Sequence, residues 1–151
     1  MILGTLYVQL SFRLDQPFSR SYSMRFASWY AILVGILLFI QWLFFLVTGQ
    51  VPELETAPWE IGCHIAAELL MGAVLVAGGI AYLKSRRWGG KILLAALGMA
   101  IYSEINSPGY FAQQGQWTLV YMFALLLMGA LVSVALIILR SGCSSESEQQ
   151  A

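Results

Sequence analysis

The sequence has little charge and few of the side chains that ordinary enzyme sites use. Of its 151 residues only 11% are charged, one is a histidine, and the formal net charge is zero. A chain without a basic surface offers no site for nucleic acid, so we expect no nucleic-acid partner. We find no Ser-His-Asp set, phosphate-binding loop or nucleotide fingerprint. These gaps argue against an enzyme but leave that alternative open.

Cysteine is equally scarce. Cys63 and Cys143 form no Cys-x-x-Cys pair of the kind that binds metals. In the topology argued below they lie on opposite sides of a membrane, which excludes a disulfide between them. Cys143 belongs to a tail of Ser, Glu and Gln, and we expect residues 141–151 to form a disordered cytoplasmic tail.

Apolar residues, by contrast, make up 59% of the chain, and the mean hydropathy is +0.73. Both values exceed those of ordinary soluble domains. A helix needs about 20 apolar residues to cross a bilayer, and four runs approach that length: 30–48, 59–83, 92–106 and 117–139. The third is short, and we expect it to stop near Pro108, which lacks a backbone donor. The sequence therefore predicts an all-α integral membrane protein, a four-helix bundle with up-down-up-down connectivity.

The basic residues indicate how this bundle is oriented. With four spans, all eight fall on one side of the membrane: Arg13, Arg20, Arg25, Lys84, Arg86, Arg87, Lys91 and Arg140. The opposite loops, 49–58 and 107–116, carry only Glu53 and Glu55 as charges. Because cytoplasmic loops are enriched in Lys and Arg, we predict a multi-pass protein of the plasma (inner) membrane with both termini in the cytoplasm.

Residues 26–140 then form the transmembrane domain, and residues 1–25 precede it. Arg13, Asp15 and Pro17 interrupt any span in this first segment, and it lacks the features of a signal peptide. One alternative is that it forms a cytoplasmic or interfacial segment. The other is that translation starts at Met24, so that residues 1–23 are an upstream extension without a structural role. The sequence leaves both alternatives open.

Small residues indicate where neighbouring helices approach closely. Nine of them recur at suitable spacing within the last three spans: Gly62, Ala66, Gly72, Ala73, Gly79, Ala95, Gly98, Gly129 and Ser133. We expect helix contacts at these positions.

Polar residues also form a stripe, since Glu60, His64 and Glu68 follow one another at intervals of four on one face of the second span. Measured from Trp59, Glu68 lies roughly 14 Å deep, close to the midplane. A carboxylate at that depth costs a few kcal/mol unless it is neutral or paired. We therefore expect Glu68 to be a neutral acid that donates a hydrogen bond to a neighbouring helix, with Glu104 of the third span as its candidate partner.

These side chains predict a polar pocket on the outer side of the bundle, lined by Glu60, His64, Glu68, Tyr102, Glu104 and Gln41. Three interpretations compete: hydrogen bonds that fix helix packing, binding or passage of a proton, cation, quinone or other small amphiphile, and an enzyme with a metal or quinone in the pocket. The Glu-x-x-His spacing of di-iron bundles is absent. We therefore assign no metal, no cofactor and no catalytic residue.

Two functions follow from this pocket. The first is a non-enzymatic helper or subunit of a membrane complex, a homo-oligomer or bound to another membrane protein. The second is a small proton- or cation-coupled transporter or channel in which Glu68 is the protonation site. No ionisable residue lies between Glu68 and Lys84 at the cytoplasmic end of the second span, which favours the first.

The run from Ala67 to Ile105, "AELLMGAVLVAGGIAYLKSRRWGGKILLAALGMAIYSEI", resembles the middle of DoxX-like small membrane proteins through Glu68, Gly72, Gly78 and Gly79. The resemblance implies a four-helix helper or small subunit associated with membrane redox or thiol-stress functions. The chain departs from that family in "GCHIAAE" and "INSPGYFAQQGQW". A separate group of uncharacterised four-helix proteins is the alternative.

Overall fold

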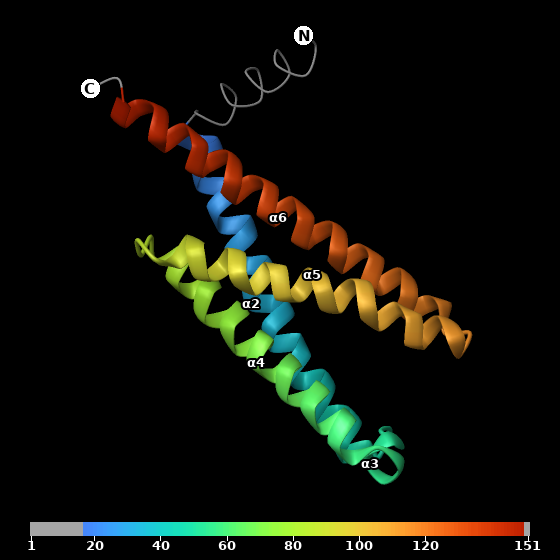
Figure 1. Cartoon of the computed structure of the whole chain (residues 1–151). Coiled ribbons are helices and arrows are strands. Elements are labelled where there is room, and N and C mark those ends of the chain that lie inside the picture. Colours follow the sequence, from blue (N-terminus) through green and yellow to red (C-terminus); the bar gives the residue numbers. More distant parts are fainter. Residues whose placement is uncertain (1–16, 150–151) are drawn as a thin grey trace.

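A computed structural model describes residues 17–149, and the regular elements of this part of the chain are all helices (Figure 1). The helices are α2 (Pro17–Thr48), α3 (Glu53–Thr56), α4 (Pro58–Leu83), α5 (Gly89–Gln113) and α6 (Trp117–Gln149). The predicted all-α class is thus confirmed for the described residues.

Three of these helices are long and apolar enough to cross a membrane, over Tyr22–Thr48, Pro58–Leu83 and Trp117–Arg140. Large apolar side chains cover their outer surfaces, such as Leu43 on α2 and Leu125 on α6, which are mostly exposed. In water such a surface would promote association, whereas in a bilayer it faces lipid. α5 does not reach the same apolarity, so a fourth crossing stays a prediction.

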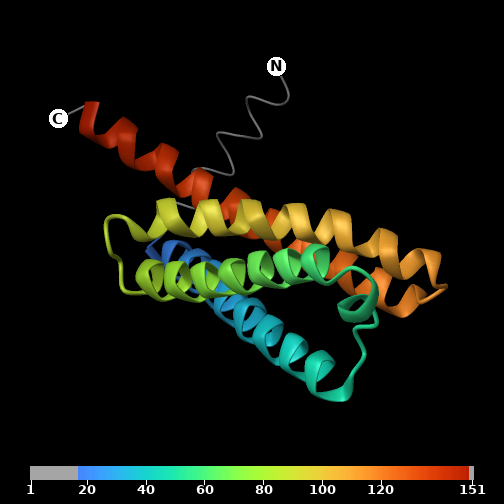
Figure 2. The same ribbon diagram turned by 60° about the horizontal axis from the view of Figure 1, so that its bottom comes forward.

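The long helices pack in a ring in which α2 and α5 each contact both α4 and α6, while α4 and α6 do not meet within the described residues. Figures 1 and 2 show the helices close together near the α4–α5 turn and spread apart at the opposite end, where α3 and the α5–α6 turn lie. The site described below lies toward this spread end.

Glycines allow α2 and α4 to approach closely. A Cβ atom added to Gly35 would lie 2.7 Å from the carbonyl oxygen of Gly72, and one on Gly79 would lie 2.9 Å from that of Ser28. Both distances are too short for a real side chain, so these positions require glycine. Gly72 and Gly79 therefore mark helix contacts as predicted, and Gly35 adds one that the sequence did not single out.

Other small residues have different surroundings. A Cβ on Gly129 would collide with the ring of Tyr30, so this position is also a contact. Gly62 and Gly98 have nothing within 4 Å of an added Cβ. The prediction of helix contacts was wrong at these two positions, because no other helix packs against either of them.

The half of the structure near the α4–α5 turn is densely packed. Leu75 on α4 and Leu93 and Leu97 on α5 are completely buried, together with Ala31 on α2 and Ala130 on α6. This apolar layer separates the spread end of the molecule from its basic end.

α5 continues past the predicted stop near Asn106 and ends only at Gln113, with Pro108 inside it. A proline removes one backbone donor, so the carbonyl group of Glu104 loses its helical partner. The ring of Phe111 stacks on that of Phe123 of α6, with centroids 5.6 Å apart. This contact holds the last turns of α5 against α6 and offsets the lost hydrogen bond.

The first and last long helices extend beyond the predicted spans. α2 begins at Pro17, so residues 17–25 are part of a helix, and proline suits its first turn. Residues 1–16 of the predicted N-terminal segment lie outside the described residues. α6 runs to Gln149 where a disordered tail was expected from residue 141. Extending an existing helix requires no new nucleation, and Glu and Gln are good helix formers.

Candidate functional site

A cavity of about 460 Å³ lies among the helices on the side of α3. Its walls come from α2, α4, α5 and α6, with Glu53 and Ala57 from the segment that joins α2 to α4. Five of the six predicted pocket residues line it: Gln41, Glu60, His64, Glu68 and Glu104. They come from α2, α4 and α5, so the fold brings together side chains that are far apart in the sequence.

Tyr102, the sixth predicted residue, does not line this cavity and is 73% exposed. The α5 residues that line the cavity are Ala100, Ser103, Glu104, Asn106, Ser107, Tyr110 and Phe111. Tyr102 lines instead a neighbouring hollow, described below, together with His64 and Glu68.

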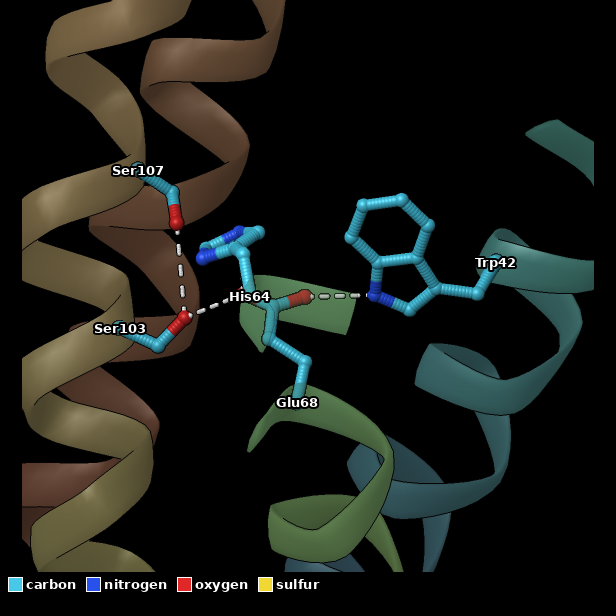
Figure 3. A network of polar contacts seen from close by, with 5 residues as sticks. All are labelled: Trp42, His64, Glu68, Ser103 and Ser107. Atoms are coloured by element: carbon cyan, nitrogen blue, oxygen red, sulfur yellow. Dashed lines mark hydrogen bonds and ion pairs between the residues drawn. The ribbon is translucent and has the colours of Figure 1, made fainter. Parts of the chain in front are cut away.

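Glu68 is the best-anchored polar group of the site (Figure 3). The indole Nε1 of Trp42 donates a hydrogen bond to its Oε2 at 2.7 Å, and the hydroxyl of Ser103 donates one to its Oε1 at 2.7 Å. His64 Nε2 lies 3.5 Å from the same Oε1. The carboxyl group thus connects α4 to both α2 and α5, and it is 9% exposed.

This geometry corrects the predicted role of Glu68. An indole N–H can only donate, so Glu68 accepts a hydrogen bond from Trp42. Its partners are Trp42 and Ser103, and the expected bond to Glu104 is not formed. Trp42 carried a signal that we did not use, because a tryptophan deep within an apolar span needs an acceptor for its N–H.

Glu104 occupies a second polar position in the same cavity and is 5% exposed. Its Oε1 lies 3.1 Å from the hydroxyl of Tyr30, which also lies 2.6 Å from the carbonyl oxygen of Leu126. Tyr30 has one proton for these two acceptors. Oε2 of Glu104 is buried without a hydrogen-bond partner. Hydrogen-bond acceptors therefore outnumber donors around Glu104.

At the exposed rim, α3 is fastened to α5 by the hydroxyl of Tyr110, which donates a hydrogen bond to Glu53 at 2.7 Å. Because the bond favours the ionised carboxylate, it lowers the pKa of Glu53 below its usual value. Glu53 thus contributes a negative charge to the cavity mouth at neutral pH.

A second hollow of about 550 Å³ lies between α4 and α5. Ala67, Ala95, Gly98, Met99 and Tyr102 line it, and we call it the side groove. It shares residues of one wall with the main cavity: His64, Glu68, Met71, Ser103 and Asn106. The two hollows are thus neighbours on either side of this wall.

The acidic residues of the cavity do not form a metal cluster. Among the residues that the structure describes, no three His, Cys, Asp or Glu side chains are close enough to hold a metal ion. The carboxyl groups are spread along the walls, and Glu68 and Glu104 have different partners.

Comparison with known proteins gives a family without an assigned activity. Residues 22–150 match DUF8058, described as a domain of unknown function. The chain belongs to the DUF8058 family. No curated protein and no solved structure matches it. The DUF8058 match covers every residue that lines the cavity and the side groove.

Proposed function

We propose that this DUF8058 protein is a four-span membrane protein whose outward-facing cavity binds a small amphiphile, and that it serves a membrane complex as a non-enzymatic helper or subunit. One observation carries the proposal: a 460 Å³ cavity of mainly apolar walls surrounds a buried carboxyl group, Glu68, that hydrogen bonds hold in place from two other helices. Ligand sites are typically of this kind, mostly apolar with a few well-placed polar groups.

The arrangement of charges supports the proposed topology. Figure 1 places the start of α2 and the end of α6 on the same side as the α4–α5 turn, which carries Lys84, Arg86 and Arg87. The acidic α3 lies at the other end. With α5 as the fourth span, the positive-inside rule puts both termini in the cytoplasm of a plasma (inner) membrane protein and the cavity on the outer side.

The side groove supports a ligand that comes from the lipid. It lies between α4 and α5 next to the Glu68 wall, and Ala67, Ala95 and Gly98 leave it open. An amphiphile dissolved in the bilayer would reach the wall of the cavity along this groove without first entering water. The resemblance to DoxX-like proteins stays a prediction, and the small-subunit role that it implies favours the same proposal.

A transporter that uses Glu68 is the second candidate, and the packing argues against it. Transport needs a path to both sides of the membrane, whereas Leu75, Leu93 and Leu97 are completely buried on the cytoplasmic side of the cavity. The enzyme alternative is weaker because the hydroxyl of Ser103 donates to Glu68, and the described residues of the cavity form no serine–histidine pair of the kind that activates a serine nucleophile.

The test is a titration of the protein in maltoside micelles, with its methionine methyl groups labelled with ¹³C. Met71 lines the cavity and is buried, whereas Met128 on α6 is exposed to detergent. We expect 4-phenylbutylamine, 4-phenylbutanol or 4-phenylbutyrate to shift the Met71 signal until it saturates and the Met128 signal only in proportion to concentration. If none of the three produces a saturable shift at Met71, the proposed binding function is wrong.

A further inference from the structure

We propose that the ligand of this cavity is a lipid-soluble organic cation, an ammonium group on an alkyl or aryl body. This inference rests on the proposed function and specifies its ligand. The cavity walls carry it through three separate features, namely their charge, their hydrogen-bonding capacity and their aromatic rings.

The charged residues of the cavity are all of one kind. Four glutamates line it, Glu53, Glu60, Glu68 and Glu104, and they come from α3, α4 and α5. None of the lysine and arginine side chains that the structure describes lines it. His64 is the one lining residue that can become positive. A ligand with a positive charge would supply the counter-ion that the protein itself does not provide.

The hydrogen-bonding groups lead to the same conclusion. The proton donors of Trp42, Ser103 and Tyr110 are already directed to glutamates of the protein. Glu104 is almost completely buried, yet its Oε2 has no partner, and its Oε1 shares the single proton of Tyr30 with a carbonyl group. A buried acceptor left unsatisfied in this way is destabilising. A ligand that brings N–H donors would complement these oxygens, whereas an anion or a carbonyl compound would add further acceptors.

Aromatic rings complete the site. Trp42 and Phe45 of α2, Tyr110 and Phe111 of α5, and Phe123 of α6 all line the cavity. Ring faces attract cations, and the attraction is stronger where water is excluded. Their apolar edges also suit a hydrophobic ligand body. A small inorganic cation would fit poorly, because the carboxyl groups are too widely spread to surround it.

The experiment compares three probes that share one phenylbutyl body in the Met71 titration at pH 7. 4-Phenylbutylamine is a cation at this pH, 4-phenylbutanol is neutral and 4-phenylbutyrate is an anion, since alkyl amines and carboxylic acids titrate far from pH 7. We expect the amine to bind at least about tenfold more tightly than the alcohol, and the anion to give no saturable shift. Met128 again reports partition into the micelle.

Matched variants test which carboxyl groups cause the preference for the amine over the alcohol. Glu68→Gln should reduce the advantage of the amine over the alcohol to less than about twofold, because it removes the buried carboxyl group with which the ammonium group would pair. Glu55→Gln removes a charge from α3 that does not line the cavity and should leave the preference unchanged. If Glu68→Gln does not fold, Glu60→Gln at the exposed part of the wall should reduce the preference about two- to threefold.

The outcomes separate this inference from the proposed function. Equal saturable binding of the amine and the alcohol, or tighter binding of the anion, would overturn the organic cation and leave the binding function standing. If Glu68→Gln and Glu60→Gln both still prefer the amine, these two carboxyl groups are not the cause of the preference, and that assignment is wrong. The absence of a saturable Met71 shift with any probe would overturn both proposals.

Discussion

At the scale of single residues, Glu68 illustrates how a carboxyl group can be kept within apolar helices. It is not paired with a lysine or arginine, and its hydrogen bonds come from Trp42 on α2 and Ser103 on α5. The indole ring provides an apolar surface and a single directed donor at once. Glu68 therefore stabilises the contact of α4 with two neighbours while it remains part of the cavity wall.

This arrangement predicts the effect of Trp42→Phe, which keeps an aromatic ring and removes the N–H group. We expect the free energy of unfolding to fall by about 1.5–3 kcal/mol, the usual contribution of a hydrogen bond to a charged group. The measurement is unfolding in mixed micelles of maltoside and dodecyl sulfate. Trp117→Phe at the exposed start of α6 is the control and should change little. Equal effects of both changes would contradict the role of the Trp42 bond.

The sequence predicted much of the cavity because helical spacing decides which side chains share a face. Glu60, His64 and Glu68 come together for this reason. The sequence could not show which helix would supply the partner of Glu68, because that depends on the rotation of α2 and α5 about their axes. Glu104 was the expected partner for its charge, yet Ser103, one residue earlier, faces Glu68.

At the scale of helices, the contact between α2 and α4 depends on the absence of side chains. Gly35 and Gly72 each bring a backbone carbonyl within about 3.3 Å of the position where the other would carry a Cβ. Close approach of two helices gains dispersion contacts, which matter most where lipid removes the hydrophobic driving force. The polar residues of the cavity begin on the side of this contact that lies toward α3.

We accordingly expect Gly35→Ala to destabilise the protein by about 1–3 kcal/mol, because the added methyl group would overlap the backbone of α4. Gly98→Ala on α5 is the matched control, since its methyl group would enter open space. It should leave the stability unchanged or raise it by up to about 1 kcal/mol. The same mixed-micelle unfolding applies, and a loss in Gly98→Ala as large as that in Gly35→Ala would refute the explanation.

Helix positions were predicted more successfully than helix ends. Apolar runs located α2, α4 and α6, because a membrane span has to be continuous in sequence. The end of α5 was predicted too early, since Pro108 was taken as a stop although the helix continues past it and packs Phe111 against Phe123 of α6. A local signal such as a proline carries no information about the contacts that the end of a helix makes with other helices after folding.

At the scale of the whole molecule, polarity is divided between two ends. The α4–α5 turn carries basic residues, and α3 carries acidic ones. Between them lies the layer of completely buried leucines that closes the cavity on one side. If α5 crosses the membrane, this division sets the direction of insertion.

Single cysteines test that topology. In a background with Cys63→Ser and Cys143→Ser, we expect Glu55→Cys and Gln114→Cys to react with a membrane-impermeant maleimide added to intact cells. Ser85→Cys should react only after the membrane has been permeabilised. Because α5 separates Ser85 from Gln114, labelling of both positions from one side would rule out the fourth crossing.

The wall shared by the cavity and the side groove has a kinetic consequence. It includes the side chains of His64, Glu68, Met71 and Ser103. A molecule moving from one hollow to the other therefore displaces these side chains, while the backbones of α4 and α5 stay in place. Side-chain rotations are generally faster than the microsecond-to-millisecond motions of whole helices. The time that a ligand spends in the cavity would then depend on how fast the hydrogen bonds to Glu68 break. It would not depend on how fast the helices of the bundle move apart.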